Sequence, residues 1–215
     1  MDPALFVHRN TAIAAPPLVP EIRLHLATEV TPLWQATERS LAGTVLPPPF
    51  WAFAWPGGQA LARYLLDNPD VVRGREVLDI GSGSGIVAIA AAKAGAARVI
   101  AAEIDPFAAA AIALNAPLNG ATVAIETRDL LDRGAAGWGG ALAGDICYEE
   151  PMSSRAIALL RRIAARGRLA LLGDPGRAYL PRNGLAERAR YEVPTSRELE
   201  AAELSEGVVW QVLPE

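Results

Sequence analysis

A carboxylate and three alternating glycines follow one another in the segment DIGSGSG, residues 79–85. Alternating glycines let the backbone adopt positive φ and let a ligand approach the main chain closely. In open α/β sheets, nucleotide-like ligands bind at such a turn after a strand. A dinucleotide would fit, because Gly83, Gly85 and Ala88 satisfy G-x-G-x-x-A and Glu103 follows twenty residues after Gly83. An adenosyl group carrying an amino acid would also fit. Asp79 favours the adenosyl ligand, since its carboxylate would attract an ammonium group and repel a diphosphate; a turn without any ligand is the weakest interpretation.

The segment GDICYEEP, residues 144–151, places a second carboxylate, Asp145, three residues before the phenol of Tyr148. Glu149 and Glu150 fit the first turn of a helix, where negative charge is favourable. Asp145 and Tyr148 are candidates for chemistry, although Tyr148 would also fit a core position with its hydroxyl satisfied. Cys147 lies between them, and we interpret it as a buried thiol because no histidine is nearby in the sequence.

Strand-like and helix-like segments alternate from residue 76 onward, which implies parallel βαβ units. We therefore expect an α/β fold with a doubly wound, mostly parallel, seven-stranded sheet and helices on both faces. The expected strands are 76–80, 98–105, 122–130, 140–145, 168–174, 187–194 and 207–214, and the expected helices are 57–69, 85–96, 106–119 and 151–167.

Residues 1–50 are irregular and proline-rich, and we expect them to form an arm packed on a domain of residues 51–215. Alternating apolar and polar positions predict a half-buried strand at 21–27. The segment PPPFWAFAWPGG, residues 47–58, carries four aromatic side chains that suit a packed cover. Among them, we expect Trp51 in the core, whereas Trp55 fits either the core or a lid over a cofactor.

Composition excludes several classes of protein. The formal net charge is −4 and the pI about 5.3, which argues against a nucleic-acid binder with a strongly basic face. A single cysteine excludes an internal disulfide and a cysteine-based zinc site, and His8 and His25 lack metal-ligand spacing, so we expect no metal. No apolar stretch is long enough to span a membrane, and the N-terminus lacks a signal-peptide pattern. We expect a cytoplasmic monomer that binds neither membrane nor nucleic acid.

Three segments, VLDIGSGSG, AAEID and TRDLL, together resemble the class I S-adenosylmethionine-dependent methyltransferases. The segments WAFAWPGGQALARYLLDNP, LAGDICYEEP and LLGDPGRAYLP narrow this resemblance. They are similar to the seven-strand protein-lysine methyltransferases that act on the β subunit of electron transfer flavoprotein. Bacterial members are often labelled nicotinamide or ribosomal-protein methyltransferase-like. The similarity runs from about residue 8 to the C-terminus. GWGGAL, residues 137–142, departs from the usual aromatic–Asp–aliphatic entry to the fourth strand, so we expect that strand to start irregularly.

The resemblance implies S-adenosyl-L-methionine as cofactor. Glu103 would accept hydrogen bonds from both ribose hydroxyls, because a carboxylate has two acceptor oxygens. Asp105 is a rival for this role, although we favour it as the N-cap of the helix that opens at Pro106. Asp129, at the end of the third strand, would accept from the adenine amino group. The implied cofactor-binding residues are Trp55, Asp79, Gly81, Gly83, Gly85, Glu103, Asp129 and Leu130.

In the resembled family a D-x-x-Y element orders the substrate lysine, which gives Asp145 and Tyr148 the catalytic role. A free lysine has a pKa of about 10.4. A nearby carboxylate would raise that pKa, so the useful role of Asp145 is to orient the amine. Desolvation by aromatic rings would lower the pKa, and their faces attract cations by about 0.5–2 kcal/mol per contact. We assign no general base, because the proton could leave to water before transfer. Arg177 and Tyr179 could line the substrate mouth, but we leave them outside the predicted site.

We predict a protein-lysine N-methyltransferase, with the β subunit of electron transfer flavoprotein or a ribosomal protein as substrate. A small-molecule N-methyltransferase is the first alternative, and a deep pocket closed by the arm would favour it. A nicotinamide-dependent oxidoreductase would bind NAD instead of S-adenosylhomocysteine. A binding module without activity is disfavoured by the intact Asp79, Glu103 and Asp145.

Overall fold

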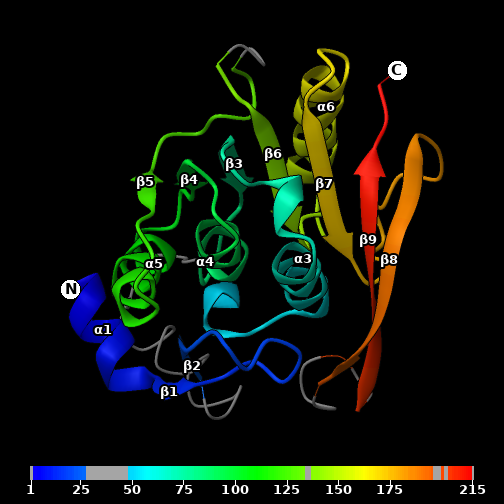
Figure 1. Cartoon of the computed structure of the whole chain (residues 1–215). Coiled ribbons are helices and arrows are strands. Elements are labelled where there is room, and N and C mark those ends of the chain that lie inside the picture. The colour runs from blue at the N-terminus through cyan, green and yellow to red at the C-terminus, as the bar shows by residue number, and fades with distance from the viewer. Residues whose placement is uncertain (1, 28–47, 134–136, 196–199, 201–202, 215) are drawn as a thin grey trace.

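The computed structural model of the chain describes residues 2–27, 48–133, 137–195, 200 and 203–214. Seven strands form the main sheet: β3 (Glu76–Ile80), β4 (Arg98–Ala102), β5 (Ala124–Glu126), β6 (Gly140–Gly144), β7 (Leu169–Asp174), β8 (Leu185–Pro194) and β9 (Leu204–Val212). Their order is β5-β4-β3-β6-β7-β9-β8 (Figure 1). The first five strands in this order pair in parallel, and β9 runs antiparallel to both β7 and β8. The expected α/β fold with a mostly parallel, seven-stranded sheet is confirmed.

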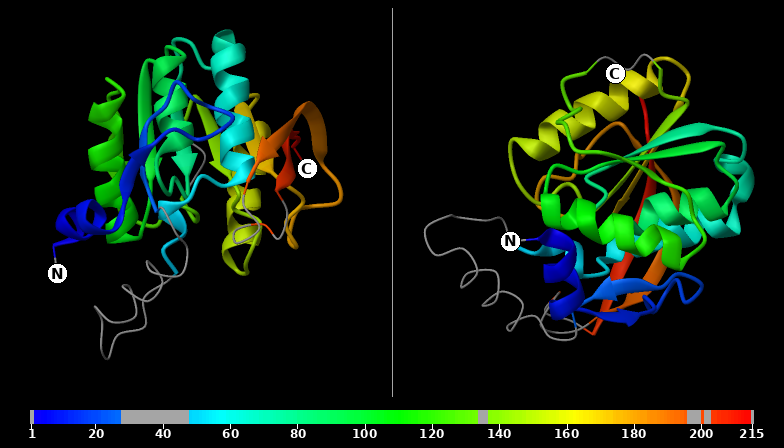
Figure 2. Two further views of the ribbon diagram at one scale, coloured as in Figure 1. Left: turned by 90° about the horizontal axis from the view of Figure 1, so that it is seen from below. Right: turned by 90° about the vertical axis from the view of Figure 1, so that its left-hand side faces the viewer.

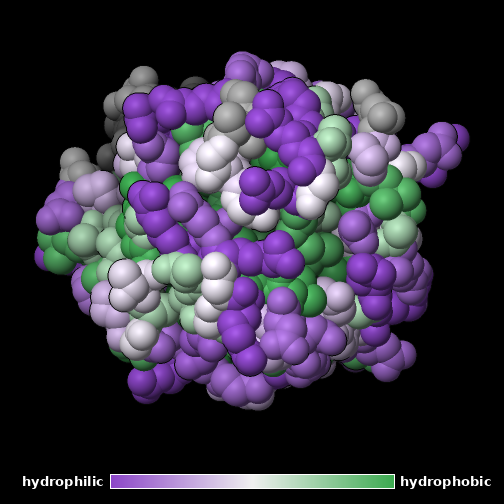
Figure 3. All heavy atoms as spheres, turned by 45° about the horizontal axis from the view of Figure 1, so that its top comes forward, coloured by the Kyte–Doolittle hydropathy of each residue, from purple (hydrophilic) through white to green (hydrophobic). Residues whose placement is uncertain are grey.

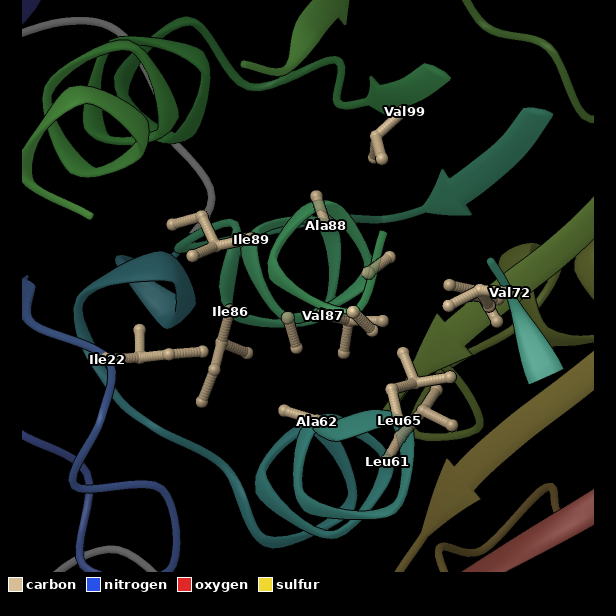
Figure 4. Close-up of a cluster of buried hydrophobic side chains, with 14 of the residues drawn as sticks. Ile22, Leu61, Ala62, Leu65, Val72, Ile86, Val87, Ala88, Ile89 and Val99 are labelled. Carbon is tan, nitrogen blue, oxygen red and sulfur yellow. The ribbon is translucent and has the colours of Figure 1, made fainter. Parts of the chain in front are cut away.

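Helices cover both faces of the sheet, as Figure 2 shows. They are α3 (Pro56–Asp67), α4 (Ile86–Lys93) and α5 (Pro106–Leu118) on one face and α6 (Met152–Ala164) on the other, with short 3-10 helices η1 (Phe50–Ala52) and η2 (Pro69–Val71) in the connections. One buried cluster joins α3 and α4 to the sheet, with Leu61 and Leu65 facing Val87 (Figure 4). A second cluster places Leu160 and Ile163 of α6 against the opposite face.

Two expected strands are shorter than the sequence pattern indicates. The strand expected at 98–105 ends at Ala102, and the strand expected at 122–130 is reduced to Ala124–Glu126. β5 lies at the edge of the sheet, pairs only with β4 over three residues and is largely exposed. An edge strand lacks a second ladder of hydrogen bonds, so an apolar pattern alone does not extend it. The prediction that this strand reaches Asp129 is therefore wrong.

The N-terminal segment contains more regular structure than expected. It holds α1 (Pro3–Asn10) and the antiparallel pair β1 (Ala12–Ala14) and β2 (Leu24–Leu26), the last within the predicted strand 21–27. The expectation of an irregular N-terminus is wrong for α1, which begins after the capping residue Asp2. The Asp2 side chain accepts from two N–H groups of the first turn, and proline occupies the first helical position.

This segment packs against the helices on its side of the sheet. Phe6 of α1 meets Phe107 of α5 edge-on, with ring centroids 5.0 Å apart. Ile22 is fully buried and points toward Ile86 of α4 (Figure 4). Residues 28–47 of the expected arm lie outside the described part of the chain, and the division into an arm of residues 1–50 and a domain of residues 51–215 stays a prediction.

Glycines allow the N-terminus of α3 to touch the backbone of the sheet. A Cβ atom on Gly57 would lie 2.4 Å from the carbonyl oxygen of Gly173, and one on Gly144 would lie 2.8 Å from the Cα of Gly58. Real Cβ atoms do not approach this closely, so larger residues at these positions would push α3 away. The WPGG segment therefore places the first turn of α3 directly over the ends of β6 and β7.

The surface in Figure 3, turned so that the top of Figure 1 comes forward, is mainly hydrophilic with separate hydrophobic patches. Within the described residues, no helix combines the length and the apolar character needed to cross a membrane.

Candidate active site

The glycine turn after β3 begins with a buried carboxylate that has one unpartnered oxygen. Asp79 is 1% exposed; its Oδ2 accepts from the Ser82 hydroxyl at 2.5 Å and from the Ala88 N–H at 3.1 Å. Its Oδ1 is also buried and has no hydrogen-bond partner among the described residues. Burial raises the pKa of Asp79 to about 7, while the hydrogen bonds from Ser82 and Ala88 act in the opposite direction. A buried acceptor without a partner is costly, and an ammonium group at Oδ1 would remove that cost.

The three predicted glycines Gly81, Gly83 and Gly85 all have φ between 54° and 83°. This left-handed conformation favours glycine and opens the main chain of the turn to a ligand. Gly81 also lies beside the end of β6, because a Cβ atom on it would be 3.3 Å from the side chain of Ile146. The turn and the D-x-x-Y element are thus neighbours.

Glu103 is fixed over the glycine turn by two backbone hydrogen bonds. Its Oε2 accepts from the Gly83 N–H at 2.9 Å and its Oε1 from the Asp105 N–H at 3.0 Å. Each oxygen keeps a free lone pair, which is what two ribose hydroxyls would need. Burial raises the pKa of Glu103. Asp105 accepts from the Phe107 N–H at 2.8 Å and caps α5, which confirms the N-cap interpretation.

Asp129 and Leu130 lie in the loop beyond β5 and not at the end of that strand. The Asp129 side chain is 45% exposed, accepts from the Leu131 N–H at 2.9 Å and pairs with Arg155 at 2.9 Å. Leu130 is buried in the cluster under α6. Asp129 is thus partly exposed and bonds its own loop and Arg155. Its role in adenine binding stays a prediction.

Asp145 lies at the carboxyl end of β6, which pairs directly with β3. Its backbone has φ 52°, an uncommon conformation for a residue other than glycine. The side chain is buried, and Oδ2 accepts from the Gly58 N–H at 2.6 Å, in the first turn of α3. Oδ1 accepts from Arg177 Nη2 at 3.0 Å and Nε at 3.3 Å. The carboxylate therefore lies between a helix N-terminus and a guanidinium group, both of which favour its ionised form.

Burial nevertheless raises the pKa of Asp145 to about 7, against the lowering effect of Arg177. Asp174, at the end of β7, adds a further raising effect as a second carboxylate. Asp174 Oδ1 accepts from the N–H groups of Gly176 and Arg177, both at 2.7 Å. These bonds turn the loop after β7 so that the Arg177 side chain folds back onto Asp145. Cys147 is buried as expected, and burial raises the pKa of its thiol.

A row of aromatic side chains leads from Tyr148 to the Arg177 guanidinium that bonds Asp145. The Tyr148 ring lies 5.2 Å from the Phe50 ring, and Phe50 lies 5.9 Å from Trp55. Trp55 in turn lies under the Arg177 guanidinium, 5.3 Å from ring centroid to Cζ. Tyr148 is 38% exposed, and burial raises its pKa to about 12. Both predicted aromatic residues, Trp55 and Tyr148, therefore lie at the same end of the sheet as Asp145, while Trp51 belongs to the core as expected.

Two polar residues extend the site beyond the predicted set. Asn115 of α5 is fully buried; its Nδ2 donates to the Ser84 carbonyl at 2.9 Å and its Oδ1 accepts from the His25 N–H at 2.8 Å. It thus ties β2 to the glycine turn. Its signal in the sequence was a lone amide within an Ala-rich helix. Arg177, which the sequence indicates only as a residue that could line the substrate mouth, bonds Asp145 directly.

Comparison with known proteins identifies the family. The family model described as ribosomal protein L11 methyltransferase (PrmA) matches residues 59–136. The electron transfer flavoprotein β subunit lysine methyltransferase of Xenopus laevis is 38% identical over 99% of this chain and 87% of its own length. This chain belongs to that family. The human protein of the same name is also 38% identical, over 100% of this chain and 84% of its own length.

The predicted enzyme class and cofactor are confirmed by this membership: the methyltransferase depends on S-adenosyl-L-methionine. The nicotinamide-dependent oxidoreductase that the G-x-G-x-x-A pattern left open is set aside. A solved magnesium protoporphyrin IX methyltransferase from Synechocystis, with bound SAM, shares the fold, with a TM-score of 0.51 and 18% identity over 71% of this chain and 76% of that chain. Within the described residues, no group of three His, Cys, Asp or Glu side chains could hold a metal ion.

Proposed function

We propose that this methyltransferase transfers a methyl group from S-adenosyl-L-methionine to the side-chain amine of a lysine in the β subunit of electron transfer flavoprotein. Relatives at 38% identity over almost the full chain carry that substrate in their name. The observation that carries the proposal is that two buried carboxylates lie at the carboxyl ends of two neighbouring strands, β3 and β6. Asp79 has an unpartnered oxygen beside the glycine turn, and Asp145 Oδ1 bonds Arg177, whose guanidinium lies over the Trp55 ring.

The residues of the turn suit the cofactor. Asp79 Oδ1 would accept from the ammonium of its amino-acid end, and the glycines leave room for it against the main chain. Glu103 would accept from the ribose hydroxyls with the lone pairs that its two backbone bonds leave free. Asp129 and Leu130 are the proposed adenine contacts, and Trp55 a proposed cover. When bound, S-adenosylmethionine supplies a methyl group made electrophilic by a sulfonium.

The role proposed for Asp145 is to orient the substrate amine. A neutral amine has one lone pair and two N–H bonds, and an acceptor behind it turns the lone pair away from the acceptor. The N–H of Gly58 holds Asp145 Oδ2 in place, so the carboxylate does not rotate and Oδ1 keeps a fixed position. The faces of Trp55 and Tyr148 would exclude water and receive the aliphatic stem of the lysine. Lysine enters as a cation, because the acidic group attracts it, and its proton goes to water before transfer.

The match to the ribosomal protein L11 methyltransferase model supports a ribosomal protein as the second candidate substrate. That match covers residues 59–136, which include the glycine turn and Glu103 but not Asp145 or Tyr148. The matched part therefore bears mainly on cofactor binding and gives the weaker support for a substrate, which is why the flavoprotein subunit stands first.

The test incubates the purified enzyme with S-adenosylmethionine and, in separate reactions, with the flavoprotein β subunit and with ribosomal protein L11 from the same source. Mass spectrometry of the digested substrates locates any added methyl group. We expect methylated lysine in the flavoprotein subunit, none in L11, and none in either when the enzyme carries Asp79→Asn. Methylation of L11 alone would overturn the choice of substrate, and methylation on a residue other than lysine would overturn the reaction.

A further inference from the structure

One cation of the chain itself already lies where a substrate lysine would bind. The Arg177 guanidinium donates from Nη2 and Nε to Asp145 Oδ1, and its Cζ lies 5.3 Å from the centroid of the Trp55 ring. A carboxylate and an aromatic face are the two features that a lysine ammonium seeks in a protein. The Arg177 side chain is 21% exposed, so part of it faces solvent.

The contacts leave no second acceptor for an incoming amine. Asp145 Oδ2 accepts from the Gly58 N–H and lies so close under the first turn of α3 that a Cβ atom on Gly57 would be 2.7 Å from it, so the helix covers its second lone pair. Two N–H groups of Arg177 take up Oδ1. A carboxylate oxygen has two lone pairs, so both lone pairs of Oδ1 are engaged. An amine that is to be oriented by Asp145 has to replace Arg177.

We propose that Arg177 occupies the lysine subsite in the absence of substrate and leaves it when the substrate lysine binds. The inference rests on the proposed lysine-directed function. It makes Arg177 a positioning residue: it keeps a positive charge beside the buried Asp145 carboxylate until the substrate brings its own. Exchange of one cation for another spares the enzyme an unpaired buried charge, which would be costly.

The choice of arginine fits this role. A guanidinium keeps its positive charge at all ordinary pH values, so it stays paired with the Asp145 carboxylate until another cation replaces it. Asp174 accepts from the backbone N–H of Arg177, whereas the partners of the guanidinium among the described residues are the side chains of Asp145, Glu200 and Trp55. The side chain can therefore move out while the loop keeps its conformation.

The exchange predicts how an enzyme without Arg177 behaves. When an internal group occupies a site, the apparent dissociation constant of a ligand equals the intrinsic constant divided by the fraction of molecules in which the site is open. In Arg177→Gln the KM for the protein substrate should therefore fall, by about threefold to tenfold, with kcat retained. Both are measured over a range of pH values, because loss of Arg177 removes a group that lowers the pKa of Asp145. Arg182→Gln, an exposed arginine in the same loop, removes the same charge and should leave KM unchanged.

The closing experiment needs no protein substrate. The thermal unfolding midpoint is measured for wild type, Arg177→Ala and Arg182→Ala with S-adenosylhomocysteine, in n-butylammonium chloride and in sodium chloride of equal concentration. We expect n-butylammonium to raise the midpoint of Arg177→Ala above its value in sodium chloride, and to shift wild type and Arg182→Ala by less, since it first has to displace Arg177 in both. An equal response in all three proteins, or none in a folded Arg177→Ala, would overturn the exchange.

Failure of the exchange and failure of the proposed function remain distinguishable. If the enzyme methylates no lysine of the flavoprotein subunit, the n-butylammonium measurement still reports whether Arg177 fills a cation site. If Arg177→Gln raises KM while wild type methylates the subunit, Arg177 is a permanent part of the site and the exchange is wrong, although the reaction stands.

Discussion

The N–H of Gly58 donates to Oδ2 of Asp145 over 2.6 Å, so the first turn of α3 holds the carboxylate that ends β6. This bond joins residues 87 positions apart. It depends on the glycines that let α3 approach the sheet, and it leaves only Oδ1 of Asp145 available to a substrate. The architecture of the site therefore depends on how closely one helix packs.

Substituting Gly57 tests that packing. A Cβ atom on Gly57 would lie 2.4 Å from a backbone oxygen of β7, whereas one on Gly58 would lie 3.4 Å from the Ile86 side chain. We expect Gly57→Ala to lower the free energy of unfolding by about 1–3 kcal/mol. Gly58→Ala is the matched control and should be neutral or slightly stabilising, because alanine is the better helix former. Urea unfolding measures both, and equal effects of the two substitutions would contradict the close approach at Gly57.

Asp79 makes the stability of the cofactor-free enzyme depend on pH. Its pKa is raised to about 7 in the folded protein, against about 3.9 in an unfolded chain. Between these values the folded state keeps a proton that the unfolded state has lost, so the free energy of unfolding falls as pH rises through this window. Asp79→Asn removes this dependence. Relative to wild type, we expect the variant to gain on the order of 2–4 kcal/mol between pH 5 and pH 8 in urea unfolding. A constant difference between the two proteins would contradict the raised pKa.

The affinity for the cofactor should depend on the same pKa of Asp79, but it should rise with pH, whereas the free energy of unfolding falls. An ammonium group at Oδ1 requires ionised Asp79, so a proton leaves below pH 7 when the ligand binds. We expect S-adenosylhomocysteine to bind about tenfold more tightly at pH 8 than at pH 6. Calorimetry at pH 6 in two buffers of different ionisation enthalpy counts the proton released. Affinity that does not change with pH would argue against the contact with Asp79.

Asn115 should link stability to cofactor affinity. Removing its buried amide leaves the Ser84 carbonyl and the His25 N–H without their partner. We expect Asn115→Ala to cost about 2–3 kcal/mol in the free energy of unfolding and to weaken S-adenosylhomocysteine binding, because the glycine turn loses an anchor. Asn119, one turn later in the chain, bonds the N–H and carbonyl of Arg23 and does not reach the turn. Asn119→Ala should therefore leave ligand affinity unchanged; a loss of affinity in both variants would point to a general effect of the N-terminal segment.

Much of the fold could be predicted from local patterns in the sequence. β3 has the predicted bounds, and α5 starts at the predicted Pro106 with its N-cap at Asp105, because a buried apolar run and a capping residue act over short distances. The extent of β5 could not be predicted, since an edge strand depends on how much of its single neighbour it meets. The helix α1 could have been found from Asp2 and the proline that follows it.

The residues of the site also differ in whether local sequence patterns can predict them. The glycine turn and Glu103 follow from spacing, because their partners lie on adjacent strands. The environment of Asp145 does not, since Gly58 and Arg177 come from distant parts of the chain and meet it only in the folded protein. The sequence could indicate that a carboxylate ends β6. The sequence could not indicate that the Arg177 guanidinium bonds this carboxylate.

The central claim is that Asp145 orients the substrate amine without taking part in cofactor binding. Asp145→Asn keeps the shape of the side chain but replaces one acceptor with an N–H₂ group, which would donate to the lone pair of the amine instead of accepting its N–H. The decisive measurement compares this variant with wild type in two assays, methyl transfer to the flavoprotein β subunit and binding of S-adenosylhomocysteine. We predict that transfer falls by about 100-fold or more while the dissociation constant changes by less than about twofold. Transfer at a nearly wild-type rate, or loss of S-adenosylhomocysteine binding, would contradict the account.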